Sequence, residues 1–338
     1  MKKSFVHCTS SLRTFFDSNA LWLSMLIGAL CYQWLLPLKP VLPWLIFFML
    51  FFTFCKVNPL DLRLHKWHGV VLAVQLCFAV GVYYALMALT GNSILAQGLM
   101  LCFIMPTATA APIIAGKLGG SIQNLTTFTL LSNFATSIIV PAFFPIVNPA
   151  ADMTFWEAFL LILSRVGPLL LTPFFAAWAV RLGYNRFTHR EFVLPTKLAV
   201  IPFYLWVMSI IVLTAVVTKT VIENFAEQIS NIILVIVGSF VVCLLQFGLG
   251  KLIGYHMPAP SKGRDYQDVL INPAAAPKTM AGVSSITAGQ AFGQKNTSLG
   301  VWMAQMYLHP LAVLGATAYI IWQNLFNSVQ LSIAAHKK

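Results

Sequence analysis

Ten long apolar stretches are the feature of this sequence that most restricts its fold. A helix that crosses a bilayer needs about 20 mostly apolar residues, and stretches of this kind recur along the 338 residues between charges, Pro and Gly. They predict spans at 20–38, 41–57, 67–90, 93–118 (interrupted), 121–147, 155–180, 194–218, 229–255, 280–308 (interrupted) and 311–334. The sequence therefore predicts an all-α polytopic membrane protein with ten transmembrane helices.

The composition excludes other classes of protein. Only 9% of the residues are charged, against about 25% in an ordinary soluble domain. The excess of Lys and Arg lies in short loops and not on one solvated face, so no nucleic-acid partner is expected. The six cysteines are scattered and form no CxxC, which favours packing roles and predicts no metal or other cofactor.

The distribution of Lys and Arg predicts the orientation in the membrane. With the N-terminus inside, 17 of these residues fall in the inner segments, and only Lys39 and Lys219 fall outside. Because positive charge is retained in the cytoplasm, both termini should be cytoplasmic and the protein should lie in the cell (inner) membrane. The first stretch is long and lacks a small-residue cleavage site, so it should be a retained span and not a signal peptide.

Two of the predicted spans are broken near the middle. Within 93–121, Pro106 and Pro112 each remove a helix hydrogen bond, and a small, polar run lies between them. The ninth span becomes polar over 289–298. Such interruptions are tolerated only where they face protein or a watery cavity.

The two breaks fall in the fourth span of each group of five, which predicts two inverted five-helix repeats. The first repeat would cover 20–150 and the second 151–334, with cytoplasmic tails at 1–19 and 335–338. Paired broken helices indicate a transporter site at the midplane, and freed amides near Thr109 and Thr297 would attract an anion. The alternative is that Pro and Gly merely kink two packed helices.

Three segments resemble the bile acid:sodium symporter family in their order and spacing. They are IMPTATAAPIIAGKLGGSIQNLTTFTLLSN at 104–133, GQKNTSLG at 293–300 and IIWQN at 320–324. The resemblance implies a core of helices three, four, five, eight, nine and ten beside a panel of helices one, two, six and seven. It also implies that helices four and nine cross and that the substrate lies in the cleft between core and panel.

The resemblance further implies roles for individual residues. Asn296 and Asn324 would line the substrate cavity, and Gln75 and Thr129 would be sodium ligands. The sequence departs from the family where a shared Glu aligns with Ala291, and where a Ser-Asn pair aligns with Ala111 and Pro112. A hard cation takes many oxygen ligands, so this divergent chain is not expected to be classically sodium-coupled. Proton coupling is the alternative to Na⁺.

Two basic residues lie inside predicted spans. An ammonium near the bilayer centre costs about 2.5 to 3.5 kcal/mol, so Lys295 could replace the field of a coupling cation, contact an anionic substrate, or donate to carbonyls freed by the break in the fourth span. Arg165 lies roughly 15 Å deep in the sixth span. It could hold a carboxylate or sulfonate through two parallel hydrogen bonds, or bond to neighbouring carbonyls.

These arguments predict two sets of site residues. The predicted substrate-binding residues are Arg165, Thr107, Thr109, Asn133, Asn296, Thr297 and Asn324. The predicted residues for a coupling ion, or for its replacement, are Lys295, Gln75, Thr129, Gln290 and Gln294.

The predicted function is secondary active transport of a small organic anion, bile-acid-like, pantoate-like or sulfonated, by alternating access. The expected partners are this anion and the lipid bilayer, with the protein a monomer. Enzyme activity is not expected because HExxH, GxSxG and a buried acid pair are all missing from the sequence. The alternatives are a sodium-coupled symporter with rearranged ion sites, or a membrane channel or sensor that does not transport.

Overall fold

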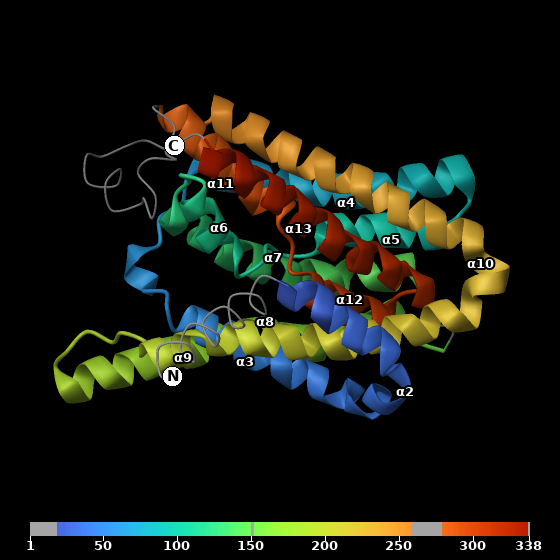
Figure 1. The fold of residues 1–338 in the computed structure, drawn as a ribbon, viewed down its shortest axis with the longest axis horizontal. Coiled ribbons are helices and arrows are strands. Elements are labelled where there is room, and N and C mark those ends of the chain that lie inside the picture. The colour runs from blue at the N-terminus through green and yellow to red at the C-terminus, as the bar shows by residue number, and fades with distance from the viewer. Residues whose placement is uncertain (1–18, 150–151, 259–278, 337–338) are drawn as a thin grey trace, which may run out of the picture.

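The computed structural model describes residues 19–149, 152–258 and 279–336, which are almost entirely helical (Figure 1). The first part of the chain forms a helix at Asn19–Leu30, α2 (Tyr32–Leu35), η1 (Leu36–Val41), α3 (Leu42–Phe54), η2 (Pro59–Asp61), α4 (Lys66–Thr90), α5 (Ser93–Ile104), α6 (Ala111–Lys117) and α7 (Ile122–Val147). The second part forms α8 (Phe155–Thr188), α9 (Thr196–Ala199), α10 (Ile201–His256), α11 (Met280–Gly293), α12 (Thr297–Tyr307), η4 (Pro310–Ala312) and α13 (Val313–His336).

Among the described residues, five helical segments are long and apolar enough to cross a membrane, which indicates a membrane-embedded protein. They are Tyr32–Phe54, Lys66–Thr90, Ile122–Val147, Phe155–Thr188 and Thr196–His256. Large apolar side chains such as Leu30 and Trp34 are exposed on the surface of the bundle, where lipid is a favourable environment.

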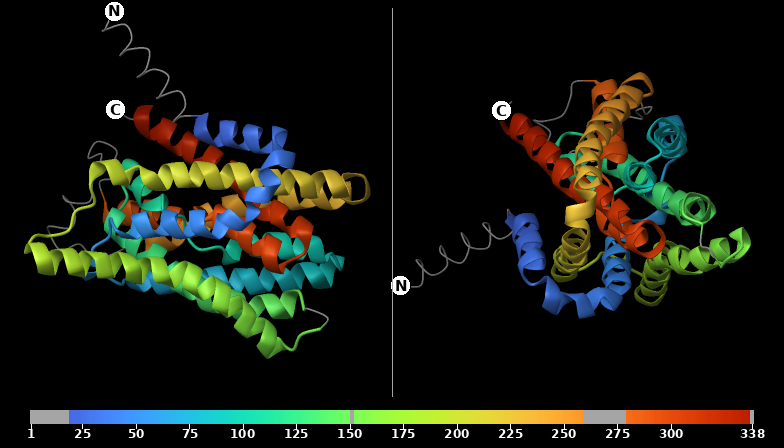
Figure 2. Two further views of the ribbon diagram at one scale, coloured as in Figure 1. Left: turned by 90° about the horizontal axis from the view of Figure 1, so that it is seen from below. Right: turned by 90° about the vertical axis from the view of Figure 1, so that its right-hand side faces the viewer.

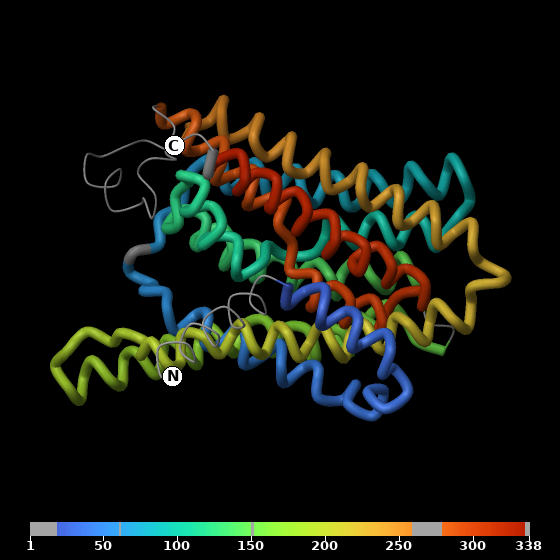
Figure 3. The backbone as a smooth tube through the Cα atoms, in the orientation of Figure 1, coloured from blue at the N-terminus to red at the C-terminus, as the bar shows by residue number. Residues whose placement is uncertain are grey.

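Both predicted interruptions are present. The fourth predicted span is divided into α5 and α6, and the ninth into α11 and α12. None of these four pieces exceeds 14 residues, which is too short to cross a bilayer alone. Figure 3 follows the chain through both links, and the link residues Met105 and Lys295 are buried.

The predicted loop at 219–228 is wrong, because α10 runs through it as one helical segment. The backbone leaves helical geometry only at Gln228, with φ −122° and ψ 18°. This kink divides α10 into a first arm, 201–227, and a second arm, 229–256, which meet at the bend seen in Figure 1. The side-chain Nδ2 of Asn231 donates to Gln228 Oε1 at 2.6 Å, and Asn231 Oδ1 accepts a hydrogen bond from Asn92 Nδ2. These bonds tie the bend to the start of α5.

The two arms of α10 pack against different neighbours. Figure 2 shows α2, α3, α8 and the first arm on one side of the bundle, away from α11, α4 and the second arm. The second arm lies very close to α11. A Cβ atom added at Gly254 would overlap the carbonyl of Ser284, and a Cβ atom added at Gly250 would overlap the carbonyl of Ala288. Small residues allow this approach between helices in membranes.

Candidate functional site

The two helix breaks lie against each other in the interior. The amide of Ala108 donates to Gln294 O at 2.9 Å, and the amide of Asn296 donates to Pro106 O at 2.8 Å. Thr107 and Lys295 form an isolated antiparallel bridge at the same place. Buried backbone groups must find hydrogen-bond partners, and here each break supplies partners for backbone groups of the other. We call this junction the crossing.

The carbonyl groups at the end of α5 are also satisfied, although the helix stops there. Pro106 lacks an amide hydrogen, and the Thr107 amide donates instead to Ser132 Oγ at 3.1 Å. Side chains from four other segments supply the donors: Gln246 Nε2 to Cys102 O (3.0 Å), Lys295 Nζ to Phe103 O (3.2 Å), Thr136 Oγ1 to Ile104 O (3.3 Å) and Gln75 Nε2 to Met105 O (3.2 Å). The break is therefore built into the packing of the bundle.

The α11–α12 break is held in the same way from α13. Gln323 accepts from the amide of Lys295 at 2.8 Å and donates to its carbonyl at 3.2 Å. The Tyr319 hydroxyl donates to Gly293 O at 2.7 Å. The resemblance at IIWQN, residues 320–324, implies a site role for Asn324, but no pattern in the sequence identifies Gln323 as a site residue.

Lys295 is almost completely buried, with 1% of its surface exposed. Its ammonium nitrogen lies 3.2 Å from Phe103 O and 5.1 Å from the centre of the Phe292 ring. This geometry corresponds to one of the three alternatives for Lys295, donation to a carbonyl freed by the break in the fourth span.

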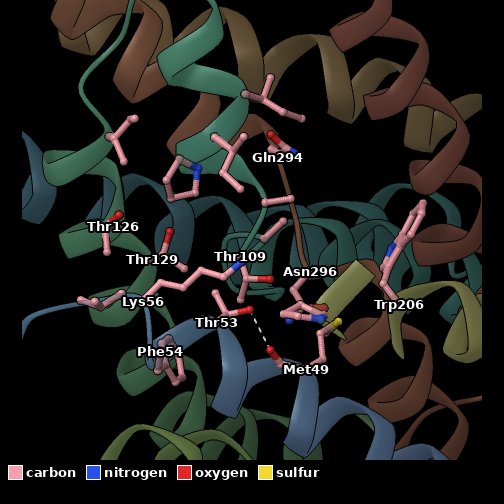
Figure 4. A pocket seen from close by; sticks show the side chains of 18 of the residues that line it. Met49, Thr53, Phe54, Lys56, Thr109, Thr126, Thr129, Trp206, Gln294 and Asn296 are labelled. Atoms are coloured by element: carbon pink, nitrogen blue, oxygen red, sulfur yellow. Dashed lines mark hydrogen bonds between the residues drawn. The ribbon is translucent and has the colours of Figure 1, made fainter. Parts of the chain in front are cut away.

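A cavity of about 610 Å³ adjoins the crossing (Figure 4). Its walls come from α6, α7, α12 and α13 on one side, and from α3, α9 and the first arm of α10 on the other. Seven of the twelve predicted site residues line it: Thr109, Thr129, Gln294, Lys295, Asn296, Thr297 and Asn324. The cavity also has apolar walls, which include Phe54, Phe203 and Trp206.

Three polar atoms of the lining residues have no hydrogen-bond partner among the described residues. They are Gln294 Oε1, Asn296 Nδ2 and Ser298 Oγ, all on buried residues. A buried polar group without a partner costs about 1 to 3 kcal/mol. These three atoms are enclosed by the protein and are not open to the cavity, so they carry a local cost at the crossing.

Lys56 contributes a second cation to the lining. It lies just beyond the end of α3, its side chain extends into the cavity in Figure 4, and its ammonium donates to Ala199 O at 2.9 Å. Partial burial lowers the pKa of Lys56 from its usual value. Within the part of the chain that the structure describes, the lining residues include two lysines and no Asp or Glu. Sequence reasoning counted Lys56 only as a loop charge, because no pattern along the chain places it beside the crossing.

Four other predicted site residues lie outside the cavity lining. Thr107 donates to Ala291 O at 2.6 Å, and Asn133 Nδ2 donates to Thr129 O at 2.7 Å. Gln75 holds Met105 O, as described above, and Gln290 Nε2 donates to Asn327 Oδ1 at 3.0 Å. All four are buried, and these hydrogen bonds hold the helices around the crossing.

Arg165 is not buried and does not line the cavity, so the expected burial of its guanidinium is wrong. Ile162, Val166 and Leu169 face the inside of the bundle, and they form one stripe of α8 at helical spacing. Arg165 falls outside this stripe. The sequence alone did not indicate which face of α8 Arg165 occupies.

The amides expected to attract an anion are largely used within the protein. The Thr297 amide donates to Lys295 O, the Leu299 amide to Asn296 Oδ1, and the Ala111 amide to Ala108 O. The positive end of α12 is therefore partly neutralised by its own cap.

Fold and site together define a membrane-embedded, all-helical protein with an interior cavity at a helix crossing. Within the described ranges, no group of three or more His, Cys, Asp or Glu side chains is placed to hold a metal ion. No known family model matches the chain, and no curated protein matches it either.

Proposed function

We propose that the protein is a secondary transporter that carries a small organic anion by alternating access. The observation that supports this most is the position of the cavity, which lies between two sets of helices and reaches a crossing of two broken helices. Transporters bind substrate at such junctions, where irregular backbone lines a cavity. A protein in which Pro and Gly only kink packed helices has no need of a cavity of about 610 Å³ at the place where the two breaks meet.

The proposed architecture is ten spans in two inverted repeats, 20–150 and 151–334. In this arrangement α5 with α6 is one span, α11 with α12 is another, and the arms of α10 are two. The core would contain α4 to α7, the second arm and α11 to α13. The panel would contain the helix at 19–30, α2, α3, α8 and the first arm.

The positive-inside rule assigns the end of the bundle with Lys56 and Lys197 to the cytoplasm. The cavity, which is lined by Lys56 and Ala199 at this end, would then open inward. In the second state of the cycle, the panel would move against the core to close this opening.

An anion is the favoured substrate because of the charge of the lining. Among the described residues, two lysines and no carboxylate line the cavity, and low-dielectric walls strengthen the field of such charges. A cationic substrate would lack a counter-charge there.

For coupling, we propose that Lys295 supplies the positive charge that a coupling cation would otherwise bring to the crossing. A sodium-coupled symporter with rearranged sites is the second candidate. It is favoured by Gln75 Oε1, Asn133 Oδ1 and Gln290 Oε1, which are buried oxygens without a partner in the described ranges. These are neutral ligands, and a hard cation prefers several oxygens that include carboxylates.

Counterflow in proteoliposomes tests the proposed function. Vesicles loaded with unlabelled anion should accumulate the labelled anion transiently above its equilibrium level. A channel gives no such overshoot, an enzyme alters the compound, and a sensor gives neither result. Loss of the overshoot for every anion in a panel of steroid, pantoate-like and sulfonated compounds would count against transport.

A further inference from the structure

Helix α8 is longer than a crossing of the membrane requires. Its 34 residues extend over roughly 51 Å at 1.5 Å per residue, whereas a bilayer is about 40 to 45 Å thick with its headgroups and about 30 Å thick without them. Figures 1 and 2 show the last turns of α8 projecting beyond the neighbouring helices at one end of the bundle. The end of α8 therefore reaches the level of the lipid headgroups.

An exposed stripe along the second half of α8 changes in character at this end. It consists of Phe175, Trp178, Leu182 and Arg186, which follow one another at intervals of three, four and four residues and are all exposed. These intervals place the four side chains on one face of the helix. The first three are apolar or aromatic and the last is a cation. Such a change is typical of the level at which acyl chains give way to headgroups.

The turn that follows α8 is held against the helix by specific contacts. His189 ends the helix in the left-handed region, with φ 54°. The amide of Phe192 donates to Asn185 Oδ1 at 2.7 Å. The guanidinium of Arg181 pairs with Glu191 at 3.7 Å and lies 5.5 Å from the centre of the Phe192 ring. The turn therefore has a defined conformation and presents its remaining side chains outward.

The charge that remains outward on this turn is positive. Arg186 and Arg190 are exposed, and neither has an ion pair among the described residues. Glu191 is the only acid in the sequence from 158 to 222, and it is already paired with Arg181. No carboxylate of this segment is left to neutralise the two arginines.

Two apolar side chains accompany the arginines. Phe187 is 87% exposed and Val193 is 77% exposed, so the described part of the protein hardly covers them. We call the surface formed by Arg186, Phe187, Arg190 and Val193 the basic patch. Basic residues beside uncovered apolar ones are the composition that favours a position in the membrane interface.

We propose that the basic patch binds the headgroups of anionic phospholipids, with Arg186 and Arg190 on phosphate oxygens and with Phe187 and Val193 among the upper parts of the acyl chains. The guanidinium fork matches the geometry of a phosphate group. Each basic residue near an anionic membrane surface strengthens binding by about five-fold. This inference concerns a surface outside the cavity and does not rest on the proposed transport function.

Lipid fits the patch better than two other kinds of anion. A soluble phosphate would pair with the arginines but would leave Phe187 and Val193 in water. An acidic protein segment could cover both kinds of side chain. However, the exposed stripe of α8 leads directly into Arg186, so the neighbour that already covers the stripe in a membrane is lipid.

Native mass spectrometry of the full chain in detergent tests the proposal. The protein is titrated with phosphatidylglycerol, which is anionic, or with phosphatidylcholine, which has no net charge, and the fraction that retains lipid gives an apparent affinity for each. The wild type should bind phosphatidylglycerol about ten-fold more tightly than phosphatidylcholine. The preference should decrease when the salt concentration rises, because exposed charges are screened.

The variants separate the patch from net charge and from general damage. Arg186→Gln with Arg190→Gln should reduce the preference for phosphatidylglycerol by at least about five-fold, whereas Lys at both positions should keep most of it. The charge-matched control is Lys39→Gln with Lys219→Gln, which removes two exposed cations from other parts of the chain and should leave the preference unchanged. Phe187→Ser with Val193→Ser should weaken the binding of both lipids, since the apolar contact is common to them.

An unchanged preference in the Arg186→Gln, Arg190→Gln protein would overturn the inference, and so would an equal loss in the Lys39→Gln, Lys219→Gln protein. Displacement of phosphatidylglycerol by about 10 mM inorganic phosphate would overturn it in favour of a site for a soluble anion. A polyglutamate peptide that displaces the lipid, and that needs the same two arginines, would overturn it in favour of an acidic protein partner.

Discussion

The ammonium of Lys295 donates to the carbonyl of Phe103 across 192 residues of sequence. One residue comes from the link between α11 and α12, and the other from the last turn of α5. The positive charge thus lies where the carbonyl end of a broken helix carries partial negative charge. The lysine joins the two breaks, which is the position that the proposed coupling role requires.

We expect anion uptake to continue when sodium is replaced by choline, because Lys295 already supplies a cation at the crossing. An imposed pH gradient should drive uptake in the wild type and not in Lys295→Met, if the proton is carried on this amine. Uptake of labelled anion into proteoliposomes measures both effects. Strong sodium stimulation of wild-type uptake would favour the rearranged sodium sites instead.

Gln323→Leu should lower the stability of the folded protein by about 2 kcal/mol or more, because it leaves the buried amide of Lys295 without its partner and removes one of the two donors to its carbonyl. Thermal unfolding in detergent measures the effect. The control is Gln330→Leu in the same helix, where Gln330 Nε2 has no partner among the residues that the structure describes. A similar fall in melting temperature for the two variants would argue against the role of Gln323.

Gly254→Ala should destabilise the protein by about 1 to 3 kcal/mol, because the added methyl group would push the second arm of α10 away from the Ser284 carbonyl. Gly248→Ala lies in the same arm, and its Cβ would have no heavy atom within 4 Å. It should be neutral or slightly stabilising, since Ala favours helix over Gly. Thermal unfolding of the pair in one detergent compares them directly.

His309 should make stability depend on pH. It lies between α12 and η4, its Nδ1 accepts from the amide of Leu311 at 3.2 Å, and burial lowers its pKa below the usual 6.5. The unfolded chain therefore takes up a proton first as the pH falls below about 6.5, and stability falls with it. His309→Asn keeps an acceptor for the cap without titrating, so its melting temperature should fall less between pH 7 and pH 5. Identical pH profiles would exclude His309 as the cause.

Cysteine labelling checks the proposed topology. In a background without native cysteines, Asp152→Cys should react with an impermeant maleimide from outside the cell, and Lys197→Cys only after the membrane is opened. The charge distribution places these positions on opposite faces. Reaction of both from the same side would contradict the ten-span arrangement.

The helix breaks could be predicted from sequence because their causes are local. Pro106 and Pro112 remove backbone donors, and the polar run that ends at Thr297 cannot lie in lipid. The partners of the freed carbonyls were not predictable, since Gln246 and Gln323 come from distant segments and no pattern marks which amide reaches which carbonyl.

The errors have equally specific causes. The charged residues Lys219, Glu223 and Glu227 predict a loop between two spans, but in the structure they continue α10 to the kink at Gln228. Charges at the end of a bundle do not stop a helix. Arg165 was placed by depth alone, whereas the side chain falls on a face of α8 that only packing decides. Lys56 was missed because a loop residue next to a helix end carries no periodic signal.

The kink at Gln228 has a mechanical consequence. The first arm of α10 runs from there to Ile201, and at 1.5 Å per residue this is a lever of roughly 40 Å. A pivot of about 10° at one end of such a lever displaces the other end by roughly 7 Å. The far end carries Ala199, Pro202 and Phe203, which line the cavity beside Lys56. A modest angular change at one residue would therefore produce its largest displacement at the opening of the cavity and its smallest at the hinge.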